Sequence, residues 1–197
     1  MTLPTDVGRC RLQVVGGGRV HFVSAEAVDF LQSCRERVGL LDRVLMKEMV
    51  HHVGDYAALG RGLREALRPG TGMALIAGRT PSDTIPWFPQ AKRQFAESCM
   101  DTERICRVLR SVPGLRVTTS EHVFNVHFKL ADWCTLLRGR FWSHLDTIGD
   151  DDMERGVSQV RVVYGEDDAA SVTFPDNFTF VQVFRDHDAR AEMPRSS

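Results

Sequence analysis

Residues that could act as a base or hold a polar group come directly after one apolar segment of the chain. The segment is Leu40-Leu41-Asp42-Arg43-Val44-Leu45-Met46, and the polar residues that follow it are Lys47, Glu48, His51 and His52. A neutral imidazole is a suitable proton acceptor near neutral pH, and a carboxylate can hold an amine or a hydroxyl group. We therefore predict that His51 and Glu48 are catalytic residues. The alternative is that one histidine packs against the next helix and the other is solvated.

The apolar segment has the length of a buried parallel strand. Its carboxyl end would present Lys47 and Glu48 at the edge where open α/β sheets bind ligands. Asp55 opens an amphipathic helix that Arg68-Pro69-Gly70 ends, and residues 72–77 form a second apolar strand. The sequence thus predicts one strand–helix–strand unit with polar residues at its ligand-binding edge.

Several spaced features of this unit together resemble a known family. Asp42-x-Val44-Leu45, the histidine pair, Leu67-Arg68-Pro69-Gly70 and the strand after it are similar to the second half of class I S-adenosylmethionine-dependent methyltransferases. Thr71 stands where that family usually has another glycine. The resemblance implies an α/β fold with a Rossmann-like, N-terminally truncated, mostly parallel sheet that ends in an antiparallel strand pair, at 115–128 and 178–184. It also implies S-adenosylmethionine as the cofactor, and the net charge of −1 favours a small-molecule substrate over nucleic acid.

The resemblance places the adenine-binding segment at Ser24-Ala25-Glu26. The family often has Asp-Ala-Glu there, and a serine hydroxyl is a weaker, uncharged acceptor for the adenine amino group. We expect Ser24, Ala25, Glu26 and Lys47 to contact the cofactor. The alternative is that Ser24 caps a helix that begins near Ala25.

The family's glycine-rich cofactor turn has no counterpart in this sequence. Residues 16–18 are glycines, but a β-forming run at 20–23 follows them instead of a helix, which favours a hairpin or loop over a nucleotide-binding turn. A strand–helix–strand unit takes about 30 residues, so the chain is expected to begin near the family's third strand, at 20–23. We predict a poorly defined segment at 1–19, a methyltransferase-like domain at 20–185 and a disordered tail at 186–197. A different α/β enzyme with a phosphate site at these glycines is a further alternative.

This departure from the family leaves the activity open between two functions. One is a methyltransferase, partial or degenerate, that acts on a small molecule. The other is a catalytically inactive interaction or dimerisation module, because a shortened sheet exposes an unpaired strand edge or an apolar patch. The partners expected for such a module are a second copy of the chain or a complete methyltransferase.

Three residues are expected on the substrate side, namely His52, Trp87 and Arg138. Trp87 lies in a proline-rich loop after the second strand, where loops cover the ligand-binding edge. Arg138 lies in a segment that resembles the substrate-side helices of small-molecule methyltransferases. The alternatives are that Trp87 anchors its loop to the core and that Arg138 is a surface residue.

The remaining chain alternates between predicted helices and strands. Helices are expected at 90–112, with Asp101 as an internal cap, at 130–141, and from Asp150 to about Tyr164. The run of aspartates at 150–152 fits the acidic first turn of that helix. Hard metal ions need spaced ligands, so no metal site is predicted.

Composition limits the class of protein. The 197 residues, 43% of them hydrophobic, predict one domain, and the net charge of −1 gives no electrostatic footprint for nucleic acid. The five cysteines lack metal-ligand spacing and fit free thiols in a reducing compartment. No signal peptide or membrane-spanning stretch is recognisable. The sequence therefore predicts a cytoplasmic protein that does not bind membranes.

Overall fold

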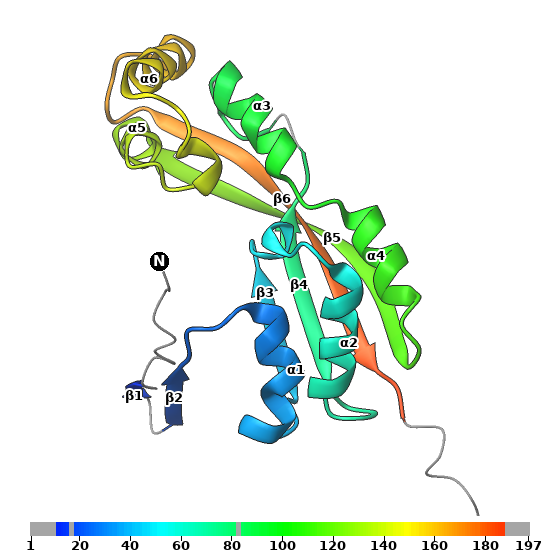
Figure 1. The fold of residues 1–197 in the computed structure, drawn as a ribbon. Helices are drawn as coiled ribbons and strands as arrows, with labels where there is room; N and C mark the ends of the chain where they lie inside the picture. The colour runs from blue at the N-terminus through cyan, green and yellow to red at the C-terminus, as the bar shows by residue number, and fades with distance from the viewer. Residues whose placement is uncertain (1–10, 16–17, 82–83, 188–197) are drawn as a thin grey trace, which may run out of the picture.

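The computed structural model describes residues 11–15, 18–81 and 84–187. These residues form an α/β fold around a four-stranded sheet in the order β3-β4-β6-β5 (Figure 1). The strands are β3 Arg43–Lys47, β4 Met73–Arg79, β5 Leu115–Lys129 and β6 Ser171–Arg185. The α/β prediction is confirmed, and so is the closing antiparallel pair, because β5 and β6 pair without interruption from Leu115↔Arg185 to Lys129↔Ser171.

The prediction of a mostly parallel sheet is wrong. Only β3 and β4 run parallel, whereas β6 pairs antiparallel with both β4 and β5. The strand–helix–strand unit supplies the one parallel pair, since a parallel connection needs a crossover element, here α2 (Tyr56–Ala66). The long β5 and β6 then add as an antiparallel pair, so the sheet is mixed.

A separate hairpin replaces the expected third strand of the parallel sheet. Strand β1 (Arg11–Val15) pairs antiparallel with β2 (Gly18–Phe22), and neither pairs with the four-stranded sheet. The interpretation of residues 16–18 as a hairpin is therefore confirmed, although residues 16 and 17 lie outside the described part. The β-forming residues at 20–23 predicted an extended segment but did not indicate which strand it pairs with. Pairing with the strand nearest in sequence closes the shortest loop and therefore costs the least entropy.

Two of the described helices begin at the aspartates that the sequence indicates, Asp55 and Asp101. The Asp55 carboxylate accepts a hydrogen bond from the Ala58 amide at 2.9 Å, and Asp101 accepts one from the Arg104 amide at 2.9 Å. The helices are α1 Ala27–Arg37, η1 Val50–His52, α2 Tyr56–Ala66, α3 Pro89–Ser98, α4 Thr102–Arg110, α5 Leu130–Arg138, η2 Ser143–Leu145 and α6 Asp150–Tyr164. None of the helices in the described residues is long and apolar enough to cross a bilayer.

Two hydrophobic cores share the long strands β5 and β6. The first core lies between the sheet and helices α1, α2 and α4, and the second lies between α3, α5, α6 and the other ends of β5 and β6 (Figure 1). Val181 and Val183 of β6 belong to the first core, whereas Val172 and Phe174 belong to the second. Because side chains alternate along a strand, odd and even positions of β6 face opposite sides. The two cores therefore lie on opposite faces of the same pair of strands.

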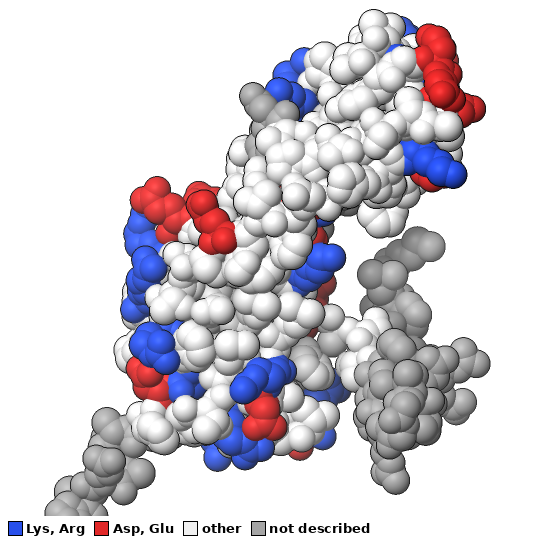
Figure 2. Space-filling view, turned by 180° about the vertical axis from the view of Figure 1, so that it is seen from behind, with Lys and Arg blue, Asp and Glu red and all other residues white. Residues whose placement is uncertain are grey.

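On the face opposite the first core, β3, β4 and the adjoining part of β6 carry no helix among the described residues. The apolar side chains on this face border a shallow cavity of about 340 Å³ and are Leu45, Leu75, Ala77, Phe124, Phe178 and Phe180. We call these six residues the open face. Leu45 is 67% exposed and Phe124 is 48% exposed. Seen from behind, uncharged side chains predominate across the middle of the molecule (Figure 2).

Candidate functional site

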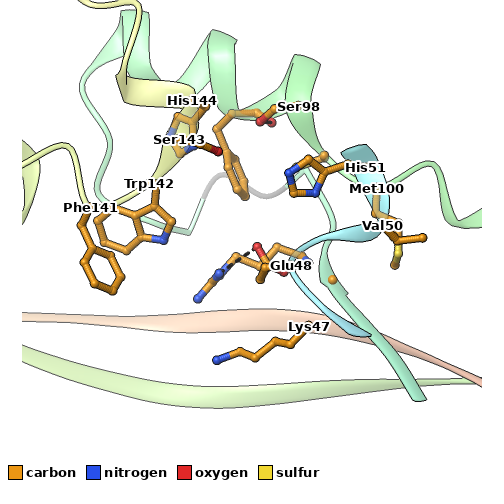
Figure 3. A pocket seen from close by; sticks show the side chains of 14 residues that line it. Lys47, Glu48, Val50, His51, Ser98, Met100, Phe141, Trp142, Ser143 and His144 are labelled. Atoms are coloured by element: carbon orange, nitrogen blue, oxygen red, sulfur yellow. Dashed lines mark hydrogen bonds and ion pairs between the residues drawn. The ribbon is translucent and has the colours of Figure 1, made fainter. Parts of the chain in front are cut away.

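A cavity of about 460 Å³ lies at the carboxyl ends of β3 and β4, where the two cores meet. We call it the junction pocket. Its ionisable lining residues are Lys47, Glu48, His51, Arg79, Cys99 and His144. Its apolar walls include Val50, Phe95, Met100, Phe141 and Trp142. Figure 3 shows side chains from β3, η1 and the 141–144 segment around this space. The pocket therefore occupies the edge at which open α/β sheets bind ligands.

Glu48 is held in an unusual backbone conformation at the end of β3. Its φ angle is +51°, in the left-handed region that a non-glycine residue rarely adopts. The Glu48 amide donates to the Ala77 carbonyl at 2.8 Å, and the carboxylate accepts from the Arg79 amide at 2.8 Å and from Arg79 Nη1 at 3.0 Å. These three hydrogen bonds tie the end of β3 to the end of β4 and offset the conformational strain.

Arg79 also binds a buried carboxylate on β6. Its Nε and Nη2 donate to the two oxygens of Asp176 at 2.7 and 2.8 Å, and its guanidinium lies 4.4 Å from the centre of the Phe178 ring. Burial by itself lowers the pKa of Arg79, but the hydrogen bonds and charges of Asp176 and Glu48 raise it overall. The guanidinium is therefore always charged, and the bidentate pair fixes its plane at the floor of the pocket.

Two imidazoles with lowered pKa values border the junction pocket. Burial, followed by the nearby His52, lowers the pKa of His51, while Glu48 opposes the shift. Burial, followed by the charge of Arg79, lowers the pKa of His144 to about 4. Both rings are therefore neutral at pH 7 and can accept a hydrogen bond or a proton. His144 Nε2 is buried and has no hydrogen-bond partner within the described residues.

The thiol in the pocket is not an activated nucleophile. Burial, followed by the charge of Glu48, raises the pKa of Cys99 to about 12. Only a thiolate is strongly nucleophilic, so Cys99 stays protonated and inert at neutral pH. The chemistry that the pocket can supply is therefore hydrogen bonding and proton acceptance by His51 and His144.

The structure brings together some of the residues singled out from the sequence. Lys47, Glu48 and His51 line the junction pocket. His52 is exposed and does not line it, although its ring centroid lies 4.0 Å from that of His51. Arg138 lies on α5 and forms an ion pair with Glu154 of α6 at 2.8 Å, outside the pocket.

Trp87 occupies the second core and does not line the junction pocket. Its side chain is 8% exposed, and its ring contacts those of Phe95, Trp133, Trp142 and His144. This placement agrees with the alternative that Trp87 anchors its loop. Its influence on the pocket is indirect, through Trp142 and His144, which line it.

The three residues expected to hold the adenine ring do not reach the pocket. Ser24, Ala25 and Glu26 are exposed in the segment between β2 and α1, and none of them borders the junction pocket. Glu26, not Ser24, precedes α1 as its N-cap, and it makes no side-chain capping bond. Because β2 pairs with β1 instead of with β3, this segment does not lie along the sheet edge. Of the four residues expected to contact the cofactor, only Lys47 lines the junction pocket.

Sequence reasoning missed four polar residues of this region, Arg79, Cys99, His144 and Asp176. Arg79 follows the predicted strand at 72–77 just as Lys47 follows the one before it, so the argument used for Lys47 also applies to Arg79. Cys99, His144 and Asp176 come from an interhelical turn, a short η helix and a strand. No periodic pattern in the sequence indicates that these three segments meet.

Comparisons with known proteins give distant structural likenesses only. No family model matches the chain, and no curated protein matches it. A provisionally assigned methyltransferase from Bacillus halodurans is 12% identical with a TM-score of 0.42, over 76% of this chain and 65% of that one. The Haemonchus contortus phosphoethanolamine N-methyltransferase 2, solved with phosphomonomethylethanolamine and S-adenosylhomocysteine, is 15% identical with a TM-score of 0.38, over 75% of this chain and 34% of that one. The chain thus spans about two thirds of the first of these neighbours and about one third of the second.

Proposed function

We propose that this chain is a methyltransferase-like protein that binds a small molecule in the junction pocket. The observation that carries the proposal is the convergence of His51, His144 and Arg79, from three distant segments, on one cavity at the carboxyl ends of β3 and β4. A volume of about 460 Å³ falls in the range of small-molecule sites. Apolar walls with a few convergent polar groups are the usual composition of such sites.

The proposed binding site would lie on the substrate side that the resemblance implies. His51 follows the first strand of the unit and would accept a hydrogen bond, or a proton, from the bound molecule. Glu48 is held by Arg79 and would orient the pocket floor. Since Ser24, Ala25 and Glu26 lie away from the pocket, no step involving S-adenosylmethionine is assigned to the described residues.

Binding in the pocket can be tested by NMR with a library of small neutral, acidic and basic compounds. We expect binders to shift the amide resonances of Gly78 and Arg79 and the indole resonance of Trp142, because these groups line the pocket. Binders that shift only residues of another cavity, such as Lys92 and Val160, would contradict the proposal.

Calorimetric titration with S-adenosylhomocysteine tests the cofactor side separately. We expect no measurable heat at millimolar ligand from a chain that circular dichroism shows to be folded. One-site micromolar binding would contradict this expectation and would support a methyltransferase with a complete cofactor site instead.

A second candidate function, a dimerisation module, is favoured by the open face. Leu45 lies on the edge strand β3, and no described strand pairs with the other side of β3. An exposed edge and an apolar patch together favour association. Analytical ultracentrifugation should then show a dimer that Leu45→Lys dissociates, while Val162→Lys, on exposed α6, leaves it intact. A wild-type monomer at high micromolar concentration would exclude this function.

A further inference from the structure

We propose that the ligand of the junction pocket is an uncharged aromatic molecule with one O–H or N–H group that donates a hydrogen bond to His51 or His144. The inference rests on the proposed function, because it names the chemical class of the molecule bound at that same site. Three features carry it, namely the balance of charges, the acceptor groups and the aromatic walls.

The four charges around the pocket floor sum to zero, because Lys47 and Arg79 are cations and Glu48 and Asp176 are carboxylates. Arg79 is held by Glu48 and Asp176, with side-chain exposures of 14%, 29% and 9% in the two ion pairs. An anionic ligand would have to compete with two carboxylates for Arg79, and a cationic ligand would have to compete with Arg79 for them. Taking an ion out of water without a dedicated partner costs several kcal/mol. Lys47, the other cation, is exposed, so it remains solvated without a ligand. The pocket therefore favours a ligand without net charge.

The two imidazoles of the pocket offer acceptor nitrogens to a ligand. His144 Nε2 is buried without a partner, and a buried polar atom that lacks a hydrogen bond costs about 1–3 kcal/mol. A ligand O–H or N–H would remove that penalty if the His144 ring turned this nitrogen towards the cavity. His51 borders the same cavity from η1, on the far side from Trp142 (Figure 3). Both rings are neutral near pH 7, so each presents one acceptor nitrogen.

The walls suit a flat apolar body. Phe95, Phe141 and Trp142 border the cavity, and the Trp142 ring packs edge-on against Phe141 with a centroid distance of 4.8 Å. Phe141 is 67% exposed, so its ring is accessible to a ligand in the cavity. An aromatic ligand between these rings would gain offset or edge-on ring contacts beyond simple burial.

The test compares three fluorinated probes of nearly equal size by ¹⁹F NMR at neutral pH. They are 4-fluorophenol, which is neutral and donates an O–H, 4-fluorobenzoate, which is an anion, and 4-fluorobenzylamine, which is a cation. We expect 4-fluorophenol to bind most tightly and to shift the ring resonances of His51 or His144. The two charged probes should bind at least about tenfold more weakly, because each must desolvate an ion.

Two variants and a matched control locate the hydrogen bond. His144→Phe and His51→Phe keep an aromatic ring but remove the acceptor, and at least one of them should weaken 4-fluorophenol binding about fivefold. His122→Phe, at an exposed position outside the pocket, should leave binding unchanged. Circular dichroism and the Trp142 resonance check that each variant is folded, and the His51 variant provides the test if His144→Phe does not fold.

The outcomes separate this inference from the proposed function. If 4-fluorobenzoate or 4-fluorobenzylamine binds the pocket more tightly than 4-fluorophenol, the inferred ligand class is wrong while small-molecule binding stands. If 4-fluorophenol binds equally well to both histidine variants, the acceptor role is wrong. If no probe shifts any pocket resonance, the proposed function fails as well.

Discussion

The two cores of this protein are built from different side chains. Every buried residue of the first core is aliphatic or sulfur-containing, for example Leu59, Leu63 and Ile76. The second core contains the buried rings of Trp87, Trp133 and other aromatic residues. The first core packs helices onto strands. Aliphatic residues that recur at helical spacing form an apolar stripe on each helix, and this stripe is enough to fill the space against the sheet. The second must also fasten the loop before α3 and the segment around η2, and large rings bury the most area per residue in such irregular backbone.

The junction pocket lies between these two kinds of core. Its floor is the ion-paired end of the first unit, at Glu48 and Arg79, and its opposite wall is the aromatic surface of the second, at Phe95 and Trp142. Binding of the proposed ligand would therefore depend on both cores being folded together. The following experiments perturb one side at a time, in decreasing order of expected effect.

Loss of the central ring of the second core should have the largest effect. Trp133 is fully buried and donates from Nε1 to the Pro86 carbonyl at 3.2 Å. Trp133→Ala should lower the free energy of unfolding by about 3–5 kcal/mol in urea denaturation. The remaining tryptophans, Trp87 and Trp142, contact the same region, so fluorescence reports this core. Transitions by fluorescence and far-ultraviolet circular dichroism that still coincide would show that the two cores unfold as one unit.

Removal of the Arg79 cation, which lies between the two cores, should lower the free energy of unfolding slightly less than Trp133→Ala does. Arg79→Met leaves the carboxylates of Glu48 and Asp176 without their partner, and breaking such a largely buried network costs about 3 kcal/mol. Denaturant unfolding at neutral pH measures the loss. Arg107→Met, which breaks the exposed pair with Glu103, is the control and should cost about 0.5 kcal/mol or less. Equal effects of the two substitutions would contradict the structural role of Arg79.

Helix α6 should be sensitive to one added methyl group. A Cβ at Gly156 would lie 2.5 Å from the Phe88 ring, so Gly156→Ala should force the loop before α3 away from α6 and cost about 1–3 kcal/mol. Gly54→Ala is the matched control, because its Cβ would meet nothing within 4 Å. Thermal unfolding of both variants measures the difference. A Gly156→Ala variant as stable as Gly54→Ala would mean that Phe88 moves freely.

Acidification should weaken the second core through His144. The pKa of this ring falls from 6.5 to about 4 on folding, so the unfolded chain binds the proton more readily. Its contribution to stability is therefore complete above pH 6.5 and is lost as the pH falls towards 4. The groups that act on the ring are Arg79, Asp146 and His51.

The measurement compares wild type with His144→Phe. Urea midpoints at neutral pH and near pH 4.5 should differ more in the wild type than in His144→Phe. The exposed residue His122 gives the control, since His122→Gln should keep the wild-type pH dependence. If the His144→Phe variant kept the full pH dependence of the urea midpoint, groups other than His144 would cause the loss of stability at low pH.

The helices and strands of the first core were predicted well, because helix caps and apolar periodicity are local features of the sequence. Asp55 and Asp101 cap helices as expected, and the strand–helix–strand unit places Glu48 and His51 at a ligand-binding edge. The partners of strands were predicted less well. The run at 20–23 is extended as expected, but it pairs with β1, since β propensity does not specify a partner.

The part of the site that belongs to the second core could not be predicted. His144 lies in a short η helix with no periodic signal, and Asp176 lies within a strand whose pairing brings it to Arg79 only in the folded sheet. The tail predicted as disordered lies mostly outside the described residues, although the Asp186 amide donates to the Gly114 carbonyl at 3.0 Å. Contacts such as Arg79–Asp176 join residues that are far apart in sequence, so no local sequence pattern indicates them.

The unbroken pairing of β5 and β6 has a consequence for the order of folding. The pair Lys129↔Ser171 closes the shortest stretch of chain between the two strands, so it loses the least loop entropy. The enclosed helices α5 and α6 contact each other and can form in the same step. Each further pair then lengthens an existing ladder towards Leu115↔Arg185. The antiparallel strands are therefore expected to zip from the aromatic core towards the aliphatic one, and the junction pocket is completed only when this ladder meets β4.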